Sequence, residues 1–153
     1  MAEKQLTNEE LAEMLRKGVA GVKEFNAYAA EGRNVCFEKA NCEEVNFCEV
    51  AFPDARFCEV NCTMASFLDA KLNGASFKKA TCVATAFTDA DLSLVNFEEA
   101  DLAEACLTGT ILEYAIFQDA YIDTANFAGA KRLDPELRCQ IIKTLLQSWE
   151  EQT

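Results

Sequence analysis

The residues that could act as nucleophiles, ligands or proton carriers are eight cysteines and a surplus of carboxylates, and the chain has no histidine. The absence of histidine removes the commonest general base and the commonest metal ligand. A nucleophilic Ser or Cys would then need a lysine or carboxylate as its activating base. Neighbouring acids such as Glu98 and Glu99 could act as an acid–base pair only where a cleft shifts one pKa. Whether such groups meet depends on the elements that carry them.

The central region repeats every five residues. Every fifth residue from Phe37 to Phe127 is apolar, nineteen positions in all, and the residue two places before each is alanine, valine or threonine. A helix would need spacings of three and four, and a strand a spacing of two. A strict period of five instead indicates a coil that turns a corner every five residues, with one large and one small side chain inward on each side.

The repeated units resemble the pentapeptide repeat family, whose motif is Ala-(Asp/Asn)-(Leu/Phe)-x-x. Examples are Ala-Asp-Leu-Ser-Leu (90–94), Ala-Asp-Leu-Ala-Glu (100–104) and Ala-Asn-Cys-Glu-Glu (40–44). The resemblance covers residues 35–130. It implies an all-β solenoid, a right-handed quadrilateral β-helix with four pentads to each turn. Residues twenty apart should therefore stack, about 4.8 Å from one another.

This register predicts which cysteines point inward and which point outward. Cys42, Cys62 and Cys82 should form one inward column of free thiols, which behave as small apolar groups and are badly oriented for a disulfide. Cys139 belongs to a terminal helix. The other four should face solvent or corners, where a reactive surface thiol stays an alternative: Cys36, Cys48, Cys58 and Cys106. We expect no metal site, no cofactor and no enzymatic activity.

Both ends of the repeat region carry signals for caps. Residues 1–34 should form a helical cap that starts with a capping box at Thr7, breaks at Gly18 and Gly21, and ends at Gly32. Residues 131–153 should form a helix with Asp134 as N-cap. Its apolar stripe would either plug the last turn of the coil or pair two copies of the chain as a homodimer. The stripe consists of Leu137, Ile141, Leu145 and Trp149, flanked by Ile142 and Leu146.

The formal net charge is −12, which argues against nucleic acid or an anionic membrane as a direct partner. Residues 80–130 contain nine acids and neither lysine nor arginine. Lower in the coil, Lys39, Glu59, Lys79 and Glu99 should form a column of alternating charge. The upper acids are expected to lack partners and to form a candidate protein-binding face: Asp89, Asp91, Glu98, Glu99, Asp101 and Glu104.

A second candidate surface is apolar. Five large apolar side chains fall at outward positions near the last turns, where either the C-terminal helix covers them or a partner protein binds. They are Leu94, Ile111, Tyr114, Ile116 and Tyr121. The sequence thus predicts a non-catalytic scaffold for an unknown protein partner. The family resemblance adds an alternative, an acidic rod that imitates DNA and inhibits or protects a type II topoisomerase (gyrase).

The first residues do not read as a targeting signal. Met1–Asn8 contains one lysine and is followed by Glu-Glu-Leu-Ala-Glu, without the apolar run that a secretory signal requires. No stretch approaches the ~18 apolar residues of a membrane span. We therefore expect a cytoplasmic protein whose cysteines stay reduced.

Overall fold

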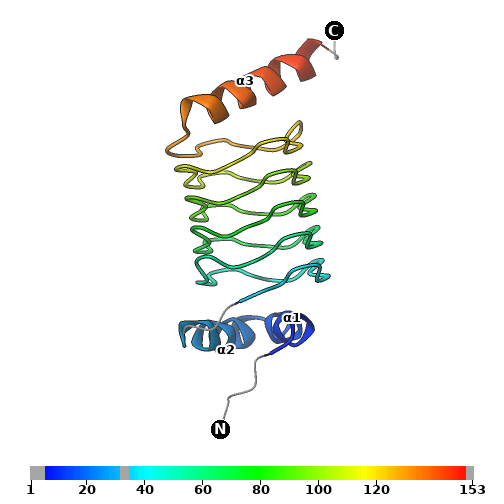
Figure 1. Ribbon diagram of the computed structural model, residues 1–153, viewed down its shortest axis with the longest axis vertical. Helices are drawn as coiled ribbons and strands as arrows, with labels where there is room; N and C mark the ends of the chain where they lie inside the picture. The colour runs from blue at the N-terminus through cyan, green and yellow to red at the C-terminus, as the bar shows by residue number, and fades with distance from the viewer. Residues whose placement is uncertain (1–5, 32–34, 151–153) are drawn as a thin grey trace.

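The computed structural model describes residues 6–31 and 35–150. Figure 1 shows a rod of stacked turns between two helical caps, α1 (Asn8–Arg16) with α2 (Val19–Ala30) at one end and α3 (Pro135–Glu150) at the other. Parallel β-bridges join residues twenty apart, from Cys36 with Arg56 to Ile111 with Lys131. The predicted stacking of four pentads per turn is therefore confirmed, and the bridged region reaches one residue beyond 130.

Each pentad contributes one bridged residue rather than a continuous strand. At most corners the residue whose number ends in 4 or 9 has a left-handed backbone, with φ between 51° and 59° at non-glycine positions such as Lys79 and Glu99. The Asn or Asp that is the second residue of many pentads stabilises this bend, because its side-chain oxygen accepts the N–H two residues on, as in Asn46 with Cys48 (2.9 Å). The chain therefore bends at each corner, so that each side of the coil is only five residues long.

We name the four sides after their pentads in the first turn: side A (35–39), side B (40–44), side C (45–49) and side D (50–54), each continuing at steps of twenty. Sides A and C carry ladders of phenylalanine. Phe57 and Phe77 stack at 4.5 Å between ring centroids, and Phe47 and Phe67 at 4.4 Å. Across the rod the rings meet edge to face, as Phe67 and Phe77 do at 85°. Both arrangements are favourable for aromatic pairs.

The N-terminal cap closes the first turn. The predicted capping box is present, with Glu10 N–H donating to Thr7 Oγ1 and Thr7 N–H donating to Glu10 Oε2. The chain breaks at Gly18 as predicted, but the predicted break at Gly21 is wrong. Gly21 lies inside α2, and a Cβ there would sit 1.8 Å from the Met14 carbonyl oxygen, so it serves the close approach of the two helices. The predicted stop at Gly32 falls outside the described residues.

The C-terminal cap touches the coil mainly through its first turns. Asp134 caps α3 as predicted, accepting from the Leu137 N–H at 2.8 Å. Leu137 is buried and Ile141 half-buried, whereas Ile142 and Leu146 are exposed. Figure 1 shows α3 rising away from the coil along its length. The helix thus plugs only part of the last turn. The side chains of Leu145 and Trp149 are not among those described.

Candidate interaction surface

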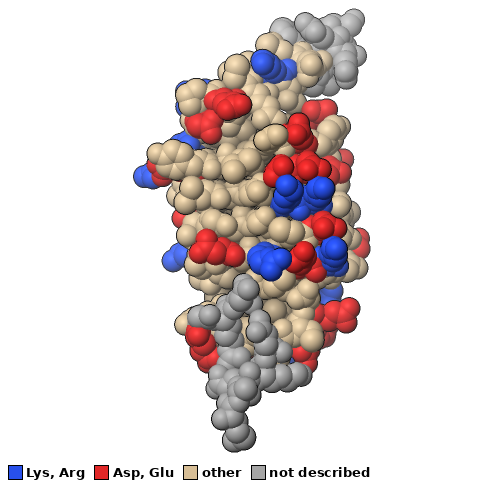
Figure 2. Space-filling model, in the orientation of Figure 1, with Lys and Arg blue, Asp and Glu red and all other residues tan. Residues whose placement is uncertain are grey.

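Paired charges run up side A of the coil. Lys39 lies 3.8 Å from Glu59 and Lys79 lies 3.5 Å from Glu99, so the predicted column of alternating charge is present. A parallel pair joins Lys78 Nζ to Glu98 Oε2 at 2.8 Å. This hydrogen bond raises the pKa of Lys78 and lowers the pKa of Glu98. Figure 2 shows basic and acidic side chains next to one another at mid-height.

The prediction that the upper acids lack partners is wrong for most of them. Glu98 and Glu99 pair with lysines one turn below, because charge balance is set between turns and not within a segment. Asp91 and Asp101 each accept a backbone N–H two residues on, at 3.0 Å. The register also distributes the six acids over all four sides, so they do not gather into one face. Asp89 and Glu104 remain exposed, on sides C and B.

The apolar candidates lie closer together. Leu94 and Tyr114 stack at the corner that ends side D, with 59% and 69% of their surfaces exposed. Ile116 follows Tyr114 across that corner and is exposed, and Ile111 lies half-buried on the same side D. Tyr121 is exposed but belongs to side B. The expectation that α3 covers these residues is wrong for Leu94 and Tyr114, because α3 leans on the end of the coil.

The inward cysteines form a column, as predicted. Cys62 Sγ and Cys82 Sγ are 3.1 Å apart, and all eight cysteines are free. Burial raises the pKa of Cys42 to about 12, and it also raises the pKa of Cys82. These thiols therefore stay protonated and serve as packing groups.

Three half-exposed cysteines, Cys48, Cys58 and Cys106, contact hydroxyl groups. Cys48 Sγ lies 3.1 Å from Ser66 Oγ, and Cys106 Sγ lies 3.2 Å from Thr108 Oγ1 and 3.3 Å from Thr88 Oγ1. These hydroxyl contacts lower the pKa of Cys106. Within the described part of the chain, no three Cys, Asp or Glu side chains group so that they could hold a metal ion.

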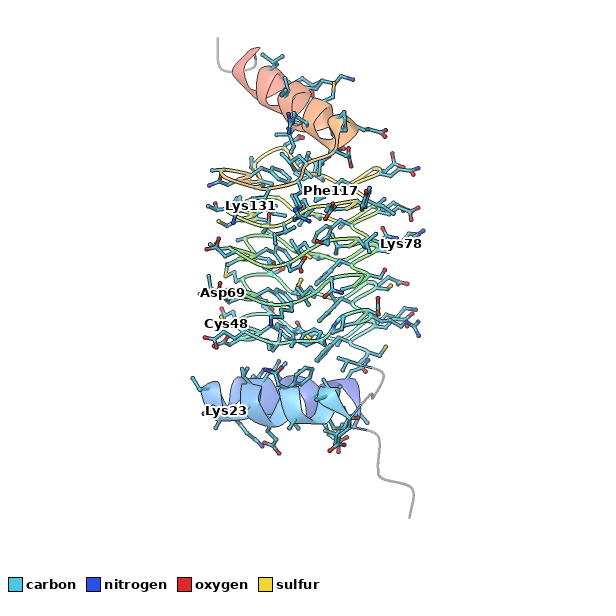
Figure 3. The ribbon with its side chains drawn as sticks, turned by 90° about the vertical axis from the view of Figure 1, so that its left-hand side faces the viewer. Lys23, Cys48, Asp69, Lys78, Phe117 and Lys131 are labelled. Atoms are coloured by element: carbon cyan, nitrogen blue, oxygen red, sulfur yellow. The ribbon has the colours of Figure 1, made fainter. Side chains whose placement is uncertain are left out.

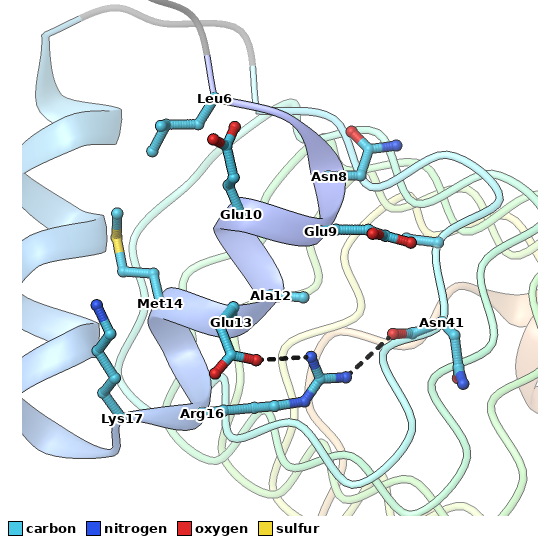
Figure 4. A pocket seen from close by; sticks show the side chains of 11 residues that line it. Leu6, Asn8, Glu9, Glu10, Ala12, Glu13, Met14, Arg16, Lys17 and Asn41 are labelled. Carbon is cyan, nitrogen blue, oxygen red and sulfur yellow. Dashed lines mark hydrogen bonds and ion pairs between the residues drawn. The ribbon is translucent and has the colours of Figure 1, made fainter.

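Two grooves lie at the ends of the rod, and no sequence pattern indicates either of them. One, of about 770 Å³, separates α1 from the first turn (Figure 4). Arg16 crosses it, donating to Glu13 Oε2 and to the Asn41 carbonyl oxygen, both at 3.4 Å. The other, of about 560 Å³, lies between the last turn and the start of α3. Both grooves depend on the position of a terminal helix against the coil, and the five-residue period does not predict that position.

The family profile described as "Pentapeptide repeats (8 copies)" matches residues 75–113 and 90–129. Residues 75–129 of this chain are therefore pentapeptide repeats. The match falls on the upper turns, and the same spacing and bridging continue below residue 75. The family match implies a right-handed quadrilateral β-helix. None of the helices described here is long and apolar enough to cross a bilayer.

Solved structures of other pentapeptide repeat proteins are similar to this chain at low identity. One from the thylakoid lumen of Arabidopsis thaliana is 23% identical, over 74% of this chain and 77% of its own, with a TM-score of 0.49. HetL, involved in heterocyst differentiation regulation in the cyanobacterium Nostoc sp., is 23% identical over 62% and 54%, with a TM-score of 0.40. QnrB1, a plasmid-mediated fluoroquinolone resistance protein, is 11% identical over 72% of each chain, with a TM-score of 0.31. No curated protein matches the chain in sequence.

Proposed function

We propose that this pentapeptide repeat protein is a non-catalytic scaffold that binds a protein partner through an apolar corner. We define the apolar corner as Leu94, Ile111, Tyr114 and Ile116. The supporting observation is the exposure of Leu94 and Tyr114, stacked where the same column holds Asp54 and Gly74 in lower turns. Exposed, contiguous apolar side chains on a folded protein are typical of interaction sites, and aromatic residues are enriched in such sites.

Acidic groups on the adjoining sides support a partner whose contact surface is basic around an apolar centre. Residues 80–130 carry nine acids without a basic residue. Only part of this charge is balanced, by lysines from the turn below and by Arg132, which pairs with Glu113. Residual charges of one sign accelerate association with an oppositely charged surface and make it sensitive to salt.

The test is affinity capture from the native cell at low salt with the full chain as bait. We expect a specific partner that is retained by the unaltered chain and lost with Leu94→Glu or Tyr114→Glu. Met64→Glu is the matched control, since Met64 is an exposed apolar corner residue of a lower turn on side B. Equal capture by all variants would refute the apolar corner.

A second arm addresses the charge. Asp89 is an exposed acid at the corner where side C meets side D, next to the apolar corner. Reversing it to lysine should weaken capture several-fold at low salt and have little effect at high salt, because exposed charges are screened. Loss that is independent of salt would indicate a different kind of contact.

The DNA-mimicking alternative is favoured by the same uncompensated charge. It predicts that the chain inhibits gyrase-catalysed supercoiling and that added salt weakens the inhibition. Its support is smaller, because the acids lie on four sides and Glu98 and Glu99 are paired with lysines. An absence of inhibition at micromolar protein would remove it.

A further inference from the structure

The last turn of the coil retains backbone groups without partners on side A. In the turn below, the N–H groups of Phe97 and Glu99 donate to Ile116 and Gln118 (2.8 and 2.9 Å), and the carbonyl of Val95 accepts from Ile116 (2.9 Å). The equivalent groups one turn higher are the Phe117 and Asp119 N–H and the Ala115 carbonyl. Across residues 6–31 and 35–150, none of these three has a hydrogen-bond partner.

These groups border the groove beneath α3. The groove is lined by Ala115, Ile116 and Phe117 on the coil and by Leu137 and Gln140 on the helix. The Phe117 ring packs inward, 5.2 Å from Phe97 and 5.9 Å from Phe127 between centroids, so Phe117 reaches the groove through its backbone. Figure 3 shows Phe117 in the upper part of the coil, below α3. The groove therefore combines an open strand edge with apolar side chains.

The charge of the residues that line the groove determines which kind of segment it would attract. Three of its lining residues are acids, Asp119, Asp134 and Glu136, and its described lining includes no lysine or arginine. Asp134 is already engaged as the N-cap of α3. Asp119 is exposed at the corner that ends side A. A cationic segment would be attracted here, and an acidic one would be repelled.

We propose that this groove binds an extended, basic and apolar peptide segment of a protein partner, which adds as a strand along residues 115–119. Carbonyls of the segment accept from the Phe117 and Asp119 N–H groups, and an N–H of the segment donates to the Ala115 carbonyl. Its cationic side chains lie near Asp119 and Glu136, and its apolar ones contact Ile116 and Leu137. Strand addition to an open edge is a common mode of peptide recognition. The inference rests on the proposed scaffold function but concerns the end of the rod.

The probe is a capped octapeptide of alternating lysine and valine, added to the full, ¹⁵N-labelled chain. We expect hydrogen exchange at the Phe117 and Asp119 amides to slow at least tenfold on binding. The same peptide with N-methylated valines should bind at least tenfold more weakly, because it loses backbone donors. A glutamate–valine octapeptide should not bind. Equal binding of the N-methylated peptide, or perturbation confined to residues outside 114–140, would overturn the proposal.

Asp119→Lys provides the variant of the chain. The same column already carries lysine at Lys39 and Lys79 with the same left-handed backbone, so the substitution suits the fold. The substitution should lower the affinity for the lysine–valine peptide at least fivefold. Asp69→Lys is the matched control, since Asp69 occupies the same place in its pentad on the opposite side of the coil from Lys78 (Figure 3). Equal weakening by the two variants would overturn the proposal.

Two further measurements separate this proposal from its alternatives. Leu94→Glu should abolish partner capture through the apolar corner and leave the octapeptide affinity unchanged, so the two proposals can fail independently. A second copy of the chain is the other candidate occupant. Dimers in sizing experiments whose Phe117 and Asp119 amides are already protected without peptide would overturn the peptide proposal.

Discussion

The two ends of the rod are closed to different degrees. At the N-terminal end, α2 places Phe25 against Phe37 and Phe52, at 6.0 and 5.0 Å between ring centroids, so an aromatic side chain completes the core. The Asn26 amide donates to the Glu49 carbonyl and accepts from the Ala51 N–H. At the other end, α3 contributes the buried Leu137 and a 3.5 Å contact from Gln140 to the Phe117 carbonyl.

The difference shows what a cap of a repeat coil has to supply. A terminal turn exposes both apolar side chains and unpaired backbone, and either can recruit another chain. The N-terminal helices meet both needs: Phe25 completes the aromatic core, and Asn26, Asn8 and Arg16 make hydrogen bonds to the backbone of the first turn. The C-terminal helix meets the first need in part and the second hardly at all, so the upper end stays accessible to a partner.

Removal of the aromatic side chain at the closed end should have the largest effect. We expect Phe25→Ala to lower the free energy of unfolding by about 3–5 kcal/mol, because a fully buried ring leaves a cavity. Urea denaturation followed by circular dichroism would measure it. Leu146→Ala, at an exposed position of α3, should change stability by less than ~0.5 kcal/mol. Comparable losses in both variants would contradict the contrast between the ends.

Truncation of the buried leucine of α3 should come second and remain local. Leu137→Ala is expected to lower the free energy of unfolding by about 2 kcal/mol, at the low end for a buried leucine, because Leu137 is the only buried apolar residue among the described side chains of α3. Hydrogen exchange should accelerate within α3 and the last turn, while the turns below residue 100 keep their protection. Loss of protection along the whole coil would show that α3 stabilises more than its own end.

High pH should weaken the fold through Cys42, the buried thiol of the first turn. The pKa of Cys42 is raised from 9.0 to about 12, so above pH 9 the unfolded chain releases this proton and the folded chain keeps it. Stability should then fall with rising pH, by up to about 1.4 kcal/mol per pH unit for this one group. Cys42→Val should make the profile shallower, while Cys82, whose pKa burial also raises, keeps part of the dependence. Cys139→Ser, at an exposed thiol, should leave the profile unchanged.

The polar part of the N-terminal cap should matter less. Asn26→Ala removes one donor and one acceptor, which take the place of the backbone partners that a further turn of the coil would supply. We expect the free energy of unfolding to fall by about 1 kcal/mol. Gln140→Ala at the open end should leave stability nearly unchanged, because its contact is long. Thermal unfolding of the two variants side by side would measure the difference. A larger loss for Gln140→Ala would reverse the comparison.

The smallest expected effect concerns the ion pair between turns. The pKa of Glu98 is lowered below 4.5 and the pKa of Lys78 is raised above 10.5, so their contribution is fully present between these two values. It should be lost as the pH falls through the lowered pKa of Glu98 or rises through the raised pKa of Lys78. Lys78→Met should abolish this dependence, with a small decrease in melting temperature near neutral pH, because exposed pairs contribute little.

The coil could be predicted from the sequence because each of its contacts recurs. The phenylalanine ladders, the Cys42 column and the Lys79–Glu99 pair all follow from counting in steps of twenty. The capping box at Thr7 could be predicted because it is a local motif. Features set by a single, non-repeating contact could not be. Examples are the approach of Gly21 to Met14, the tilt of α3 about Leu137, and the groove beneath it.

Each turn of the coil consists of four pentads, and this limits how the length of such a chain can change. Loss or gain of a single residue would shift the phase of every later pentad, so that inward phenylalanines would point to solvent. Duplication of twenty residues would preserve every phase and lengthen the rod by about 4.8 Å. Homologous rods should therefore differ by whole turns, while the distance between the two caps varies in fixed steps.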